Sequence, residues 1–425
     1  QKALGVDCAE GADCSRPYVV AMTGQLGVDV SQGNTTLVDI NGDGLPDVLD
    51  STQIGAHKFF INRLEPNGTQ TLTTLSSAIG TGSDYDLSKQ SVQMLDVDGN
   101  GYTDLLNASQ GKALLNRGNG DWETTPASLW GSGDDGGLPT DFAPQDGELK
   151  TVRFLDYNGD KRIDILKSSG SDASNVTQIY RSQGVGTFDY DEDAESIGAG
   201  FDSGALELND MNGAGLLDPV EIQTSQVRYR LNYGRGHWGP WETITGFTFT
   251  DSERVQAELE DINGDSLADI VLVSGDLVQY WINRNGASFD PVRVIDDSDV
   301  DGDLPTKDST TTILFADMNG NGSTDVVWIS SGGQVTYLEI FPVRPNLLSR
   351  ITNGIGKVID ITYGTSVQHR ADDNGTSNQW QYPLPHAMTV VDSLDEWDQL
   401  TSVHNEVIYH YHHGFYDGVE KAFRG

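Results

Sequence analysis

The sequence of 425 residues contains only two cysteines, Cys8 and Cys14, and both lie near the N-terminus. Two cysteines alone cannot supply the four ligands of a structural zinc site, and no histidine lies near them. Their close spacing favours a small disulfide loop, which would form and persist in an oxidising compartment. The alternative is a pair of free, exposed thiols.

Long apolar runs and basic residues are also scarce. No stretch of 18 consecutive apolar residues occurs, so the sequence predicts no membrane-spanning helix. The chain has 26 Lys and Arg against 64 Asp and Glu, which gives a formal net charge of −38. Such a charge repels phosphate backbones and anionic lipids, and it argues against nucleic acid and membrane surfaces as partners. It fits a secreted protein that meets calcium outside the cytosol.

Motifs of common enzymes are missing as well. The sequence has no phosphate-binding glycine loop followed by Lys-Ser/Thr, no nucleophile elbow and no His-Glu-x-x-His. We therefore expect a protein without enzymatic activity. The stretch "HYHHGF" places His410 and His412 on one face of an expected strand, with His413 beside them. Because the sequence places no carboxylate or third ligand there, a surface strand is favoured over a metal site.

Glycine and turn-forming residues are abundant. The 49 glycines, together with many Thr, Val, Ser and Asp residues, indicate short strands joined by turns. With 36% hydrophobic residues, the chain can still bury a core. An all-β fold is the prediction.

One acidic pattern occurs six times. Its copies begin at residues 39, 96, 156, 210, 261 and 317, and they read "DINGDGLPD", "DVDGNGYTD", "DYNGDKRID", "DMNGAGLLD", "DINGDSLAD" and "DMNGNGSTD". These acidic loops are named below by their first residue. Neighbouring copies start 51 to 60 residues apart, and a nearly constant period of this length is typical of stacked or radially arranged units.

Each unit is expected to contain four antiparallel strands. In the fifth unit Val255, Ala257 and Leu259 alternate with polar residues, the acidic loop follows, and three further strand-like runs come after it. Units of this kind are typical of β-propeller blades. Six blades over residues 16–343 are favoured, with "RPYVVAMTG" near the N-terminus completing the last one, and five or seven blades are the alternatives.

The acidic loops predict calcium sites. Side chains at positions 1, 3, 5 and 9 and the carbonyl at position 7 can surround Ca²⁺ with oxygen, as in the first half of an EF-hand loop. The predicted ligands are Asp39, Asn41, Asp43, Leu45 and Asp47; Asp96, Asp98, Asn100, Tyr102 and Asp104; Asp156, Asn158, Asp160, Arg162 and Asp164; Asp210, Asn212 and Asp218; Asp261, Asn263, Asp265, Leu267 and Asp269; and Asp317, Asn319, Asn321, Ser323 and Asp325.

The six loops differ in the number of carboxylates. Those at 39, 96, 156 and 261 keep three, and the loop at 317 keeps two. The loop at 210 has Ala214 where an oxygen ligand is needed, so this site is expected to be weak or empty. The alternative for all six is an Asx-rich turn without metal.

These repeats resemble the FG-GAP (VCBS) class of calcium-binding propeller repeats found in integrin heads and in many bacterial secreted proteins. The resemblance covers about three quarters of the chain and implies calcium-stabilised blades. It says little about function, because such propellers host many binding roles.

The pattern changes at Arg344. The stretches "RPNLLSRITNGIGKVIDITYG", "YPLPHAMTVVDSLDEWD" and "VIYHYHHGFYDGVEKAFRG" alternate like strands but contain no acidic loop, and residues 344–425 are predicted to form a second β module. Their order resembles the segment that follows the propeller in the B components of insecticidal toxin complexes (Tc toxins), in SpvB-like proteins and in the Rhs class. In that family the propeller docks onto a pore-forming component and gates the exit, and the following segment begins a large β-shell that continues beyond the position of Gly425.

The resemblance implies a docking and gating module of a secreted toxin-delivery protein. The alternative is a stand-alone secreted adhesion or glycan-binding propeller, for which His237, Trp238 and Trp241 in "GRGHWGPWETI" would be the candidate contacts. A third hypothesis is an enzyme that uses the central pocket of the propeller.

Overall fold

The structure is a computed structural model and describes residues 16–26, 35–51, 57–75, 82–89, 91–118, 122–128, 151–170, 174–184, 187–201, 205–382, 384–417 and 422–424. The predicted Cys8–Cys14 disulfide and the N-terminal segment 1–15 lie outside these residues. The regular secondary structure of the described chain is almost entirely strand, as the sequence predicted. Its helices are η1 (Gly82–Tyr85), α1 (Asp251–Arg254) and α2 (Ser366–Asp373), and none of these is long and apolar enough to cross a membrane.

Five sheets contain four strands each that are consecutive in the chain. They are sheet 1 with β2 (Thr35–Val38), β3 (Asp47–Asp50), β4 (Lys58–Leu64) and β5 (Gln70–Leu75); sheet 2 with β6 (Val92–Leu95), β7 (Asp104–Asn107), β8 (Lys112–Leu114) and β9 (Ala127–Ser128); sheet 3 with β10 (Val152–Leu155), β11 (Asp164–Ser169), β12 (Val176–Gly184) and β13 (Thr187–Tyr190); sheet 4 with β14 (Leu206–Asn209), β15 (Asp218–Ile222), β16 (Gln226–Tyr229) and β17 (Glu242–Thr245); and sheet 5 with β18 (Ala257–Glu260), β19 (Asp269–Ser274), β20 (Leu277–Trp281) and β21 (Arg293–Ile295). Each acidic loop joins the first two strands of its sheet, as predicted.

The sixth group takes its last strand from the other end of the chain. Sheet 6 contains β22 (Thr312–Ala316), β23 (Asp325–Ile329) and β24 (Gln334–Glu339), and β1 (Tyr18–Gln25) pairs antiparallel with β24. Strand β1 also forms one parallel pair with β5, which links sheets 6 and 1 into one eight-stranded sheet. The N-terminal strand thus fills the place that the sequence predicted for it.

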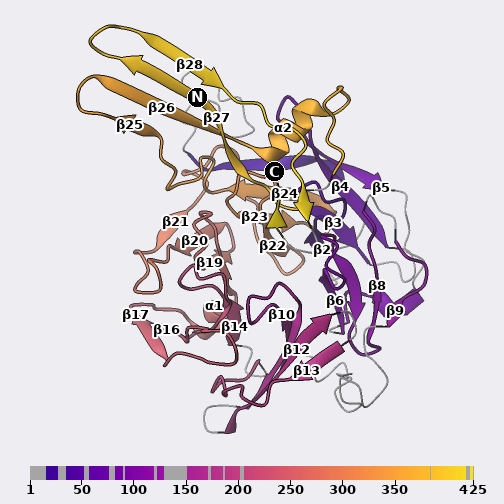
Figure 1. The fold of residues 1–425 in the computed structure, drawn as a ribbon. Helices are drawn as coiled ribbons and strands as arrows, with labels where there is room; N and C mark the ends of the chain where they lie inside the picture. Colours follow the sequence, from indigo (N-terminus) through magenta and orange to yellow (C-terminus); the bar gives the residue numbers. More distant parts are fainter. Residues whose placement is uncertain are drawn as a thin grey trace.

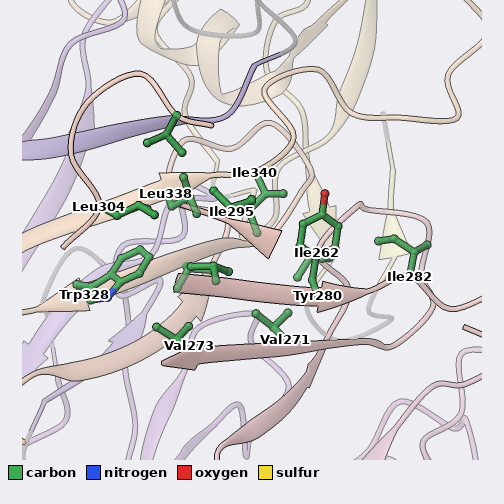
Figure 2. Packing of buried hydrophobic residues seen from close by; sticks show 13 residues of the cluster. Ile262, Val271, Val273, Tyr280, Ile282, Ile295, Leu304, Trp328, Leu338 and Ile340 are labelled. Carbon is green, nitrogen blue, oxygen red and sulfur yellow. The ribbon is translucent and has the colours of Figure 1, made fainter. Parts of the chain in front are cut away.

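Among the described residues the core is divided into six clusters, of which five lie between sheets that are consecutive in the chain and one lies between the last sheet and the first. Figure 2 shows the one between sheets 5 and 6, where Val271 and Tyr280 meet Trp328 and Leu338. The adjacent Ile270 belongs to the cluster between sheets 4 and 5, because successive side chains of a strand point to opposite faces. The remaining clusters join sheets 6 and 1, 1 and 2, 2 and 3, and 3 and 4. The packing contacts therefore form a closed cycle around the molecule, and Figure 1 shows the sheets in this order.

The predicted first strand of the fifth unit is shorter than expected. A capping box between Thr250 and Glu253 starts the single helical turn α1, in which Val255 is the C-cap. Val255 is 59% exposed and lies outside β18. Alternation of apolar residues suggested a strand there, but the local capping interaction determined the backbone.

The C-terminal residues form sheets of their own. One contains β25 (Arg350–Thr352), β26 (Lys357–Thr365), β27 (Thr389–Asp398) and β28 (His404–Ile408), and a short one contains β29 (Tyr416–Asp417) and β30 (Ala422–Phe423). The predicted strand over Val358–Tyr363 lies within β26. In Figure 1 the hairpins of the larger sheet project away from sheets 1–6, whereas α2 lies close to sheet 1.

Candidate functional site

The acidic loops share one hydrogen-bonding pattern. In the loop at 39, the Asp39 carboxylate accepts hydrogen bonds from the backbone N–H groups of Gly42, Asp43 and Gly44 at 2.7 to 3.1 Å. The carboxylates at position 1 of the other five loops accept from the same three positions. Position 1 therefore fixes the turn in every copy.

The loop backbone adopts positive φ at positions 4 and 6. Glycine occupies position 4 in all six loops and position 6 in four of them. Position 6 is Lys161 in the loop at 156 and Ser266 in the loop at 261, both at φ 70°. Glycine adopts this region without the steric cost that a Cβ atom brings, which explains its regular spacing in the sequence.

The aspartate at position 9 is buried in every loop, and in five of the six its carboxylate accepts a backbone N–H from a residue in or just after the third strand of the sheet. Asp218 is an example, because its carboxylate accepts from the N–H of Met211 at 3.0 Å and from the N–H of Asn232 at 2.7 Å. Burial raises the pKa of these carboxyls, to about 7 in Asp104 and to about 8 in Asp269. Their visible role is to brace the loop, and their predicted role as metal ligands stays a prediction.

Two loops bring three carboxylates together. Among the described residues, ligand oxygens of Asp96, Asp98 and Asp104 lie within 4.8 Å of one another, and so do those of Asp156, Asp160 and Asp164. The loop at 210 keeps the same turn without a carboxylate at position 5, since the Ala214 N–H still bonds to Asn212 and Asp210. The turn therefore forms even in a loop that lacks one of the predicted calcium ligands. The other predicted ligands, including the position 7 carbonyls, lie in the same turns and remain predictions.

A buried carboxylate on β24, next to the loop at 317, was missed in the sequence analysis. Glu339 of β24 is fully buried opposite Asp325, and its carboxylate accepts from Asn319 at 2.6 Å, Asn321 at 2.5 Å and Ser323 at 3.2 Å. Burial raises the pKa of Glu339, and these donors oppose that effect. The sequence could have indicated this carboxylate, because a glutamate stands here at a strand position that is apolar in four other sheets. The residues at that position are Ile61, Leu115, Leu231 and Ile282.

A repeated asparagine in the third strand was also missed. The residues directly after Leu115, Leu231 and Ile282 are Asn116, Asn232 and Asn283. Their side-chain amides donate to the position 2 carbonyl of a neighbouring acidic loop at 3.0 Å. Asn62 does the same across the junction of sheets 1 and 6, where it donates to the Met318 carbonyl at 2.8 Å. The recurring Asn in "FINR", "LLNRG", "RLNYG" and "WINRN" was visible in the sequence, but only the structure shows that it links different sheets.

The C-terminal segment covers several acidic loops. The Leu384 N–H donates to the Gly42 carbonyl at 2.8 Å, and Arg370 of α2 donates to the same oxygen at 3.2 Å. Arg344 donates to the Gly264 carbonyl and to the Thr389 hydroxyl, which connects the loop at 261 to β27. The two guanidinium groups bring positive charge to loops that are otherwise strongly acidic.

A cavity of about 430 Å³ lies beneath this cover. Asp39, Asp261 and Asp317, the first residues of three acidic loops, contribute to its lining, and residues 385–387 of the C-terminal segment line it as well. Burial and the nearby Asp43 raise the pKa of Asp39 to about 7, and burial raises that of Asp317 to the same value. The cavity therefore lies between sheets 1, 5 and 6 and the C-terminal module, and three aspartates border it.

In the aromatic loop of sheet 4 Trp238 faces inward, whereas His237 is exposed. Trp238 is 6% exposed, and its indole N–H donates to the Glu195 carbonyl at 3.1 Å. The guanidinium carbon of Arg228 lies 4.3 Å from the centroid of the Trp241 ring. The Trp238 side chain thus packs in the core and is not free to stack on a sugar.

Residues 283–425 match the family described as the insecticide toxin TcdB middle/N-terminal region. The structure is similar to that of the Photorhabdus luminescens Tc holotoxin pore, with a TM-score of 0.75 and 20% sequence identity over 97% of this chain. It is also similar to the crystal structure of TcdB2-TccC3, with a TM-score of 0.62 and 19% identity over 96% of this chain. The chain shares its fold with these toxin structures. It spans 19% of the length of each of the two matched chains, and no curated protein sequence matches it.

Proposed function

We propose that the chain is the docking and gating part of a secreted Tc toxin B-like protein, and that it acts by binding and not by catalysis. The observation that carries this proposal is the C-terminal segment over the acidic cavity in a chain that shares its fold with Tc toxin structures, and this cavity would lie at the central opening of the propeller. Residues 385–387 would restrict passage through the opening. Residues 344–425 would begin the shell that holds the toxic domain.

The six sheets would form a six-bladed β-propeller. The closed cycle of core clusters supports this arrangement, because radial packing buries both faces of every blade against its neighbours. The C-terminal module covers the face that carries the acidic loops. In an antiparallel sheet the next hairpins lie at the opposite end of the strands, so the hairpins between second and third strands would face a pore-forming partner.

Binding to the pore-forming component of a Tc toxin tests the docking role. Leu277 is 37% exposed and begins the third strand of sheet 5, directly after such a hairpin. We expect the full chain to bind in a sedimentation assay and Leu277→Arg to weaken binding about tenfold or more. Leu400→Arg, in the hairpin of the C-terminal module where Leu400 is 80% exposed, should bind normally. Absence of binding by the unaltered chain, or equal effects of both variants, would contradict the proposal.

Calcium is the ion that the acidic loops fit best. In the loops at 96 and 156, three converging carboxylates form a hard oxygen donor set, and position 1 already holds the turn in place. Bound calcium would neutralise the repulsion among these carboxylates and would thereby stabilise each loop. Its role would be structural.

The Asp160→Ala variant tests the calcium proposal, because it gives the loop at 156 the residue that the loop at 210 has naturally. We expect excess chelator to lower the melting temperature of the unaltered chain, and Asp160→Ala to show a smaller calcium-dependent shift. Asp189→Ala, at an exposed position of β13 in the same sheet, is the control and should keep the full calcium-dependent shift of the melting temperature. A melting temperature that does not respond to chelator would eliminate calcium from this proposal.

A further inference from the structure

Two histidines and an aspartate meet outside the acidic loops. His410 and His412 follow β28, and Asp373 is the last residue of α2. The Asp373 carboxylate lies 3.3 Å from His410 Nε2 and 2.8 Å from His412 Nδ1. The three ligand atoms lie within 4.8 Å of one another. The expected surface strand thus ends before these histidines, and the helix supplies the carboxylate that the sequence did not place.

A second layer of side chains orients these groups. His369 Nδ1 lies 3.3 Å from His410 Nδ1, and His369 Nε2 lies 2.9 Å from Asp392 Oδ1. With the proton of His369 on Nε2, which donates to Asp392, its Nδ1 accepts a hydrogen bond from His410 Nδ1. The lone pair of His410 Nε2 then points toward the Asp373 carboxylate. Trp380 Nε1 donates to the same carboxylate at 2.9 Å.

This arrangement places two electron-rich atoms face to face. When His410 Nε2 carries no proton, it and the Asp373 carboxylate repel each other at 3.3 Å, and either a proton on Nε2 or a metal ion between the two atoms removes this repulsion. Asp373 is buried, whereas His410 and His412 are partly exposed, so an ion can enter from solvent. Hydrogen bonding of a ligand histidine to another residue is a regular feature of metal sites, where it fixes the ring orientation.

We propose that His410, His412 and Asp373 bind one zinc-type transition-metal ion. Tetrahedral zinc with bonds of about 2.0–2.1 Å separates its ligands by about 3.4 Å. His410 Nε2 lies 3.3 Å from Asp373 Oδ1, which is close to this value, whereas His412 Nδ1 lies only 2.8 Å from Asp373 Oδ2 and would move away from it when the ion binds. Imidazole nitrogen favours zinc over calcium, which prefers oxygen. Water would occupy the fourth position.

Such a metal would fasten the end of the chain to the cover of the acidic loops. Helix α2 contacts sheet 1 through the bond from Arg370 to Gly42, and it approaches sheet 6 where Val367 lies next to Gly320. Residues 409–413 belong to no strand of the described chain, and they are joined to β27 by the Tyr409 N–H, which donates to the Asp392 carbonyl at 2.8 Å, and by the Tyr411 hydroxyl, which donates to the Val391 carbonyl at 3.0 Å. A metal between α2 and this segment would hold both on the same face of the molecule.

Zinc binding by the chelator-stripped full chain, with excess calcium present, tests the proposal. We expect calorimetry to show one zinc equivalent, and Co²⁺ to give the visible absorption of a four-coordinate site. His412→Ala should abolish or strongly weaken binding. His369→Ala, which removes only the orienting partner, should weaken it about 10- to 100-fold. His413→Asn is the matched control, because His413 lies outside the cluster at φ 54° and asparagine tolerates this backbone conformation.

Several outcomes would overturn the proposal. One is that the unaltered chain does not bind zinc, and another is that calcium displaces zinc. A third is that His412→Ala keeps the zinc affinity of the unaltered chain while circular dichroism shows that the variant is folded. If His412→Ala fails to fold, Asp373→Asn and His369→Ala provide the comparison with His413→Asn. The proposal does not depend on the docking role, since a glycan-binding or free-standing protein could use the same site.

Discussion

At the scale of single residues, buried polar side chains join apolar ones in holding this fold together. Position 9 aspartates brace the acidic loops, and the repeated asparagines carry that bracing from one sheet to the next. A buried donor or acceptor that loses its partner costs about 1–3 kcal/mol, so each such group is an exacting constraint. These hydrogen bonds explain why Asp and Asn recur at fixed positions of the repeat, since alternation along a strand alone would not require them.

The asparagine links can be tested at Asn283, which is fully buried and donates to the carbonyls of Met211 and Ala268 at 3.0 and 3.1 Å. Asn283→Ala leaves both carbonyls without this donor and should lower the free energy of unfolding by about 2–4 kcal/mol. Asn405→Ala, at an exposed position of β28, should change it by less than about 0.5 kcal/mol. Chemical denaturation measures both values, and equal effects would refute the role assigned to Asn283.

The pH dependence of stability provides a second test at this scale. Burial and the neighbouring Glu258 raise the pKa of Glu207 to about 7, from an ordinary value near 4.5. A carboxyl whose pKa is raised by folding favours the folded state at low pH. Its contribution is complete below about pH 4.5 and is lost as the pH rises through 7.

Glu207→Gln should therefore remove part of the stability loss between pH 5 and pH 8, on the order of 2 kcal/mol. Denaturation curves at several pH values measure this difference. The exposed Glu242→Gln on β17 serves as the control and should follow the unaltered protein. A Glu207→Gln profile parallel to that of the unaltered protein would show that Glu207 titrates normally in the folded state.

At the scale of loops and strands, the same turn serves different surroundings. Gly264 and Gly215 both have positive φ, at 72° and 78°. A Cβ at Gly264 would collide with the Gly322 carbonyl of the next acidic loop, whereas a Cβ at Gly215 would meet no atom within 4 Å. Gly264 occupies position 4 of its acidic loop and Gly215 occupies position 6 of its loop, and only at Gly264 does a neighbouring loop fill the space.

This contrast predicts unequal effects of alanine. Gly215→Ala should cost about 1–2 kcal/mol from the left-handed backbone alone. Gly264→Ala should cost about 1–3 kcal/mol more, because the loops at 261 and 317 must separate. Unfolding by denaturant at saturating calcium measures both, and equal losses would mean that the two loops are not in contact.

At the scale of the whole molecule, one N-terminal strand connects the first sheet to the last. Strand β1 pairs with β24 along most of its length and meets β5 at Thr23, and Met22 is buried in the cluster between sheets 6 and 1. Without this strand, β24 would expose an unpaired edge, and such edges promote aggregation.

A chain that begins at residue 27 should therefore melt at a lower temperature and aggregate on concentration. A synthetic peptide of residues 16–26, added in excess, should restore the melting temperature, whereas a scrambled peptide should not. Calorimetry and light scattering measure the two effects. Unchanged melting of the shortened chain would show that closure by β1 contributes little to stability.

The sequence by itself determined the all-β class, the period of the repeat, the position of each acidic loop and the strand that completes sheet 6. These features follow from local rules, namely alternation along strands, glycine at positive φ and carboxylates that accept backbone N–H groups. The exposed position of Val255 differed from the sequence prediction, because a capping box outweighed the strand pattern.

Only the tertiary structure decided which side chains from distant parts of the chain meet. It placed Glu339 against the loop at 317, turned Trp238 into the core and brought Asp373 to His410 and His412. It also put the C-terminal segment over the acidic cavity. Each of these contacts joins segments that have no fixed relation in sequence, and their geometry arises only when the sheets pack around one another.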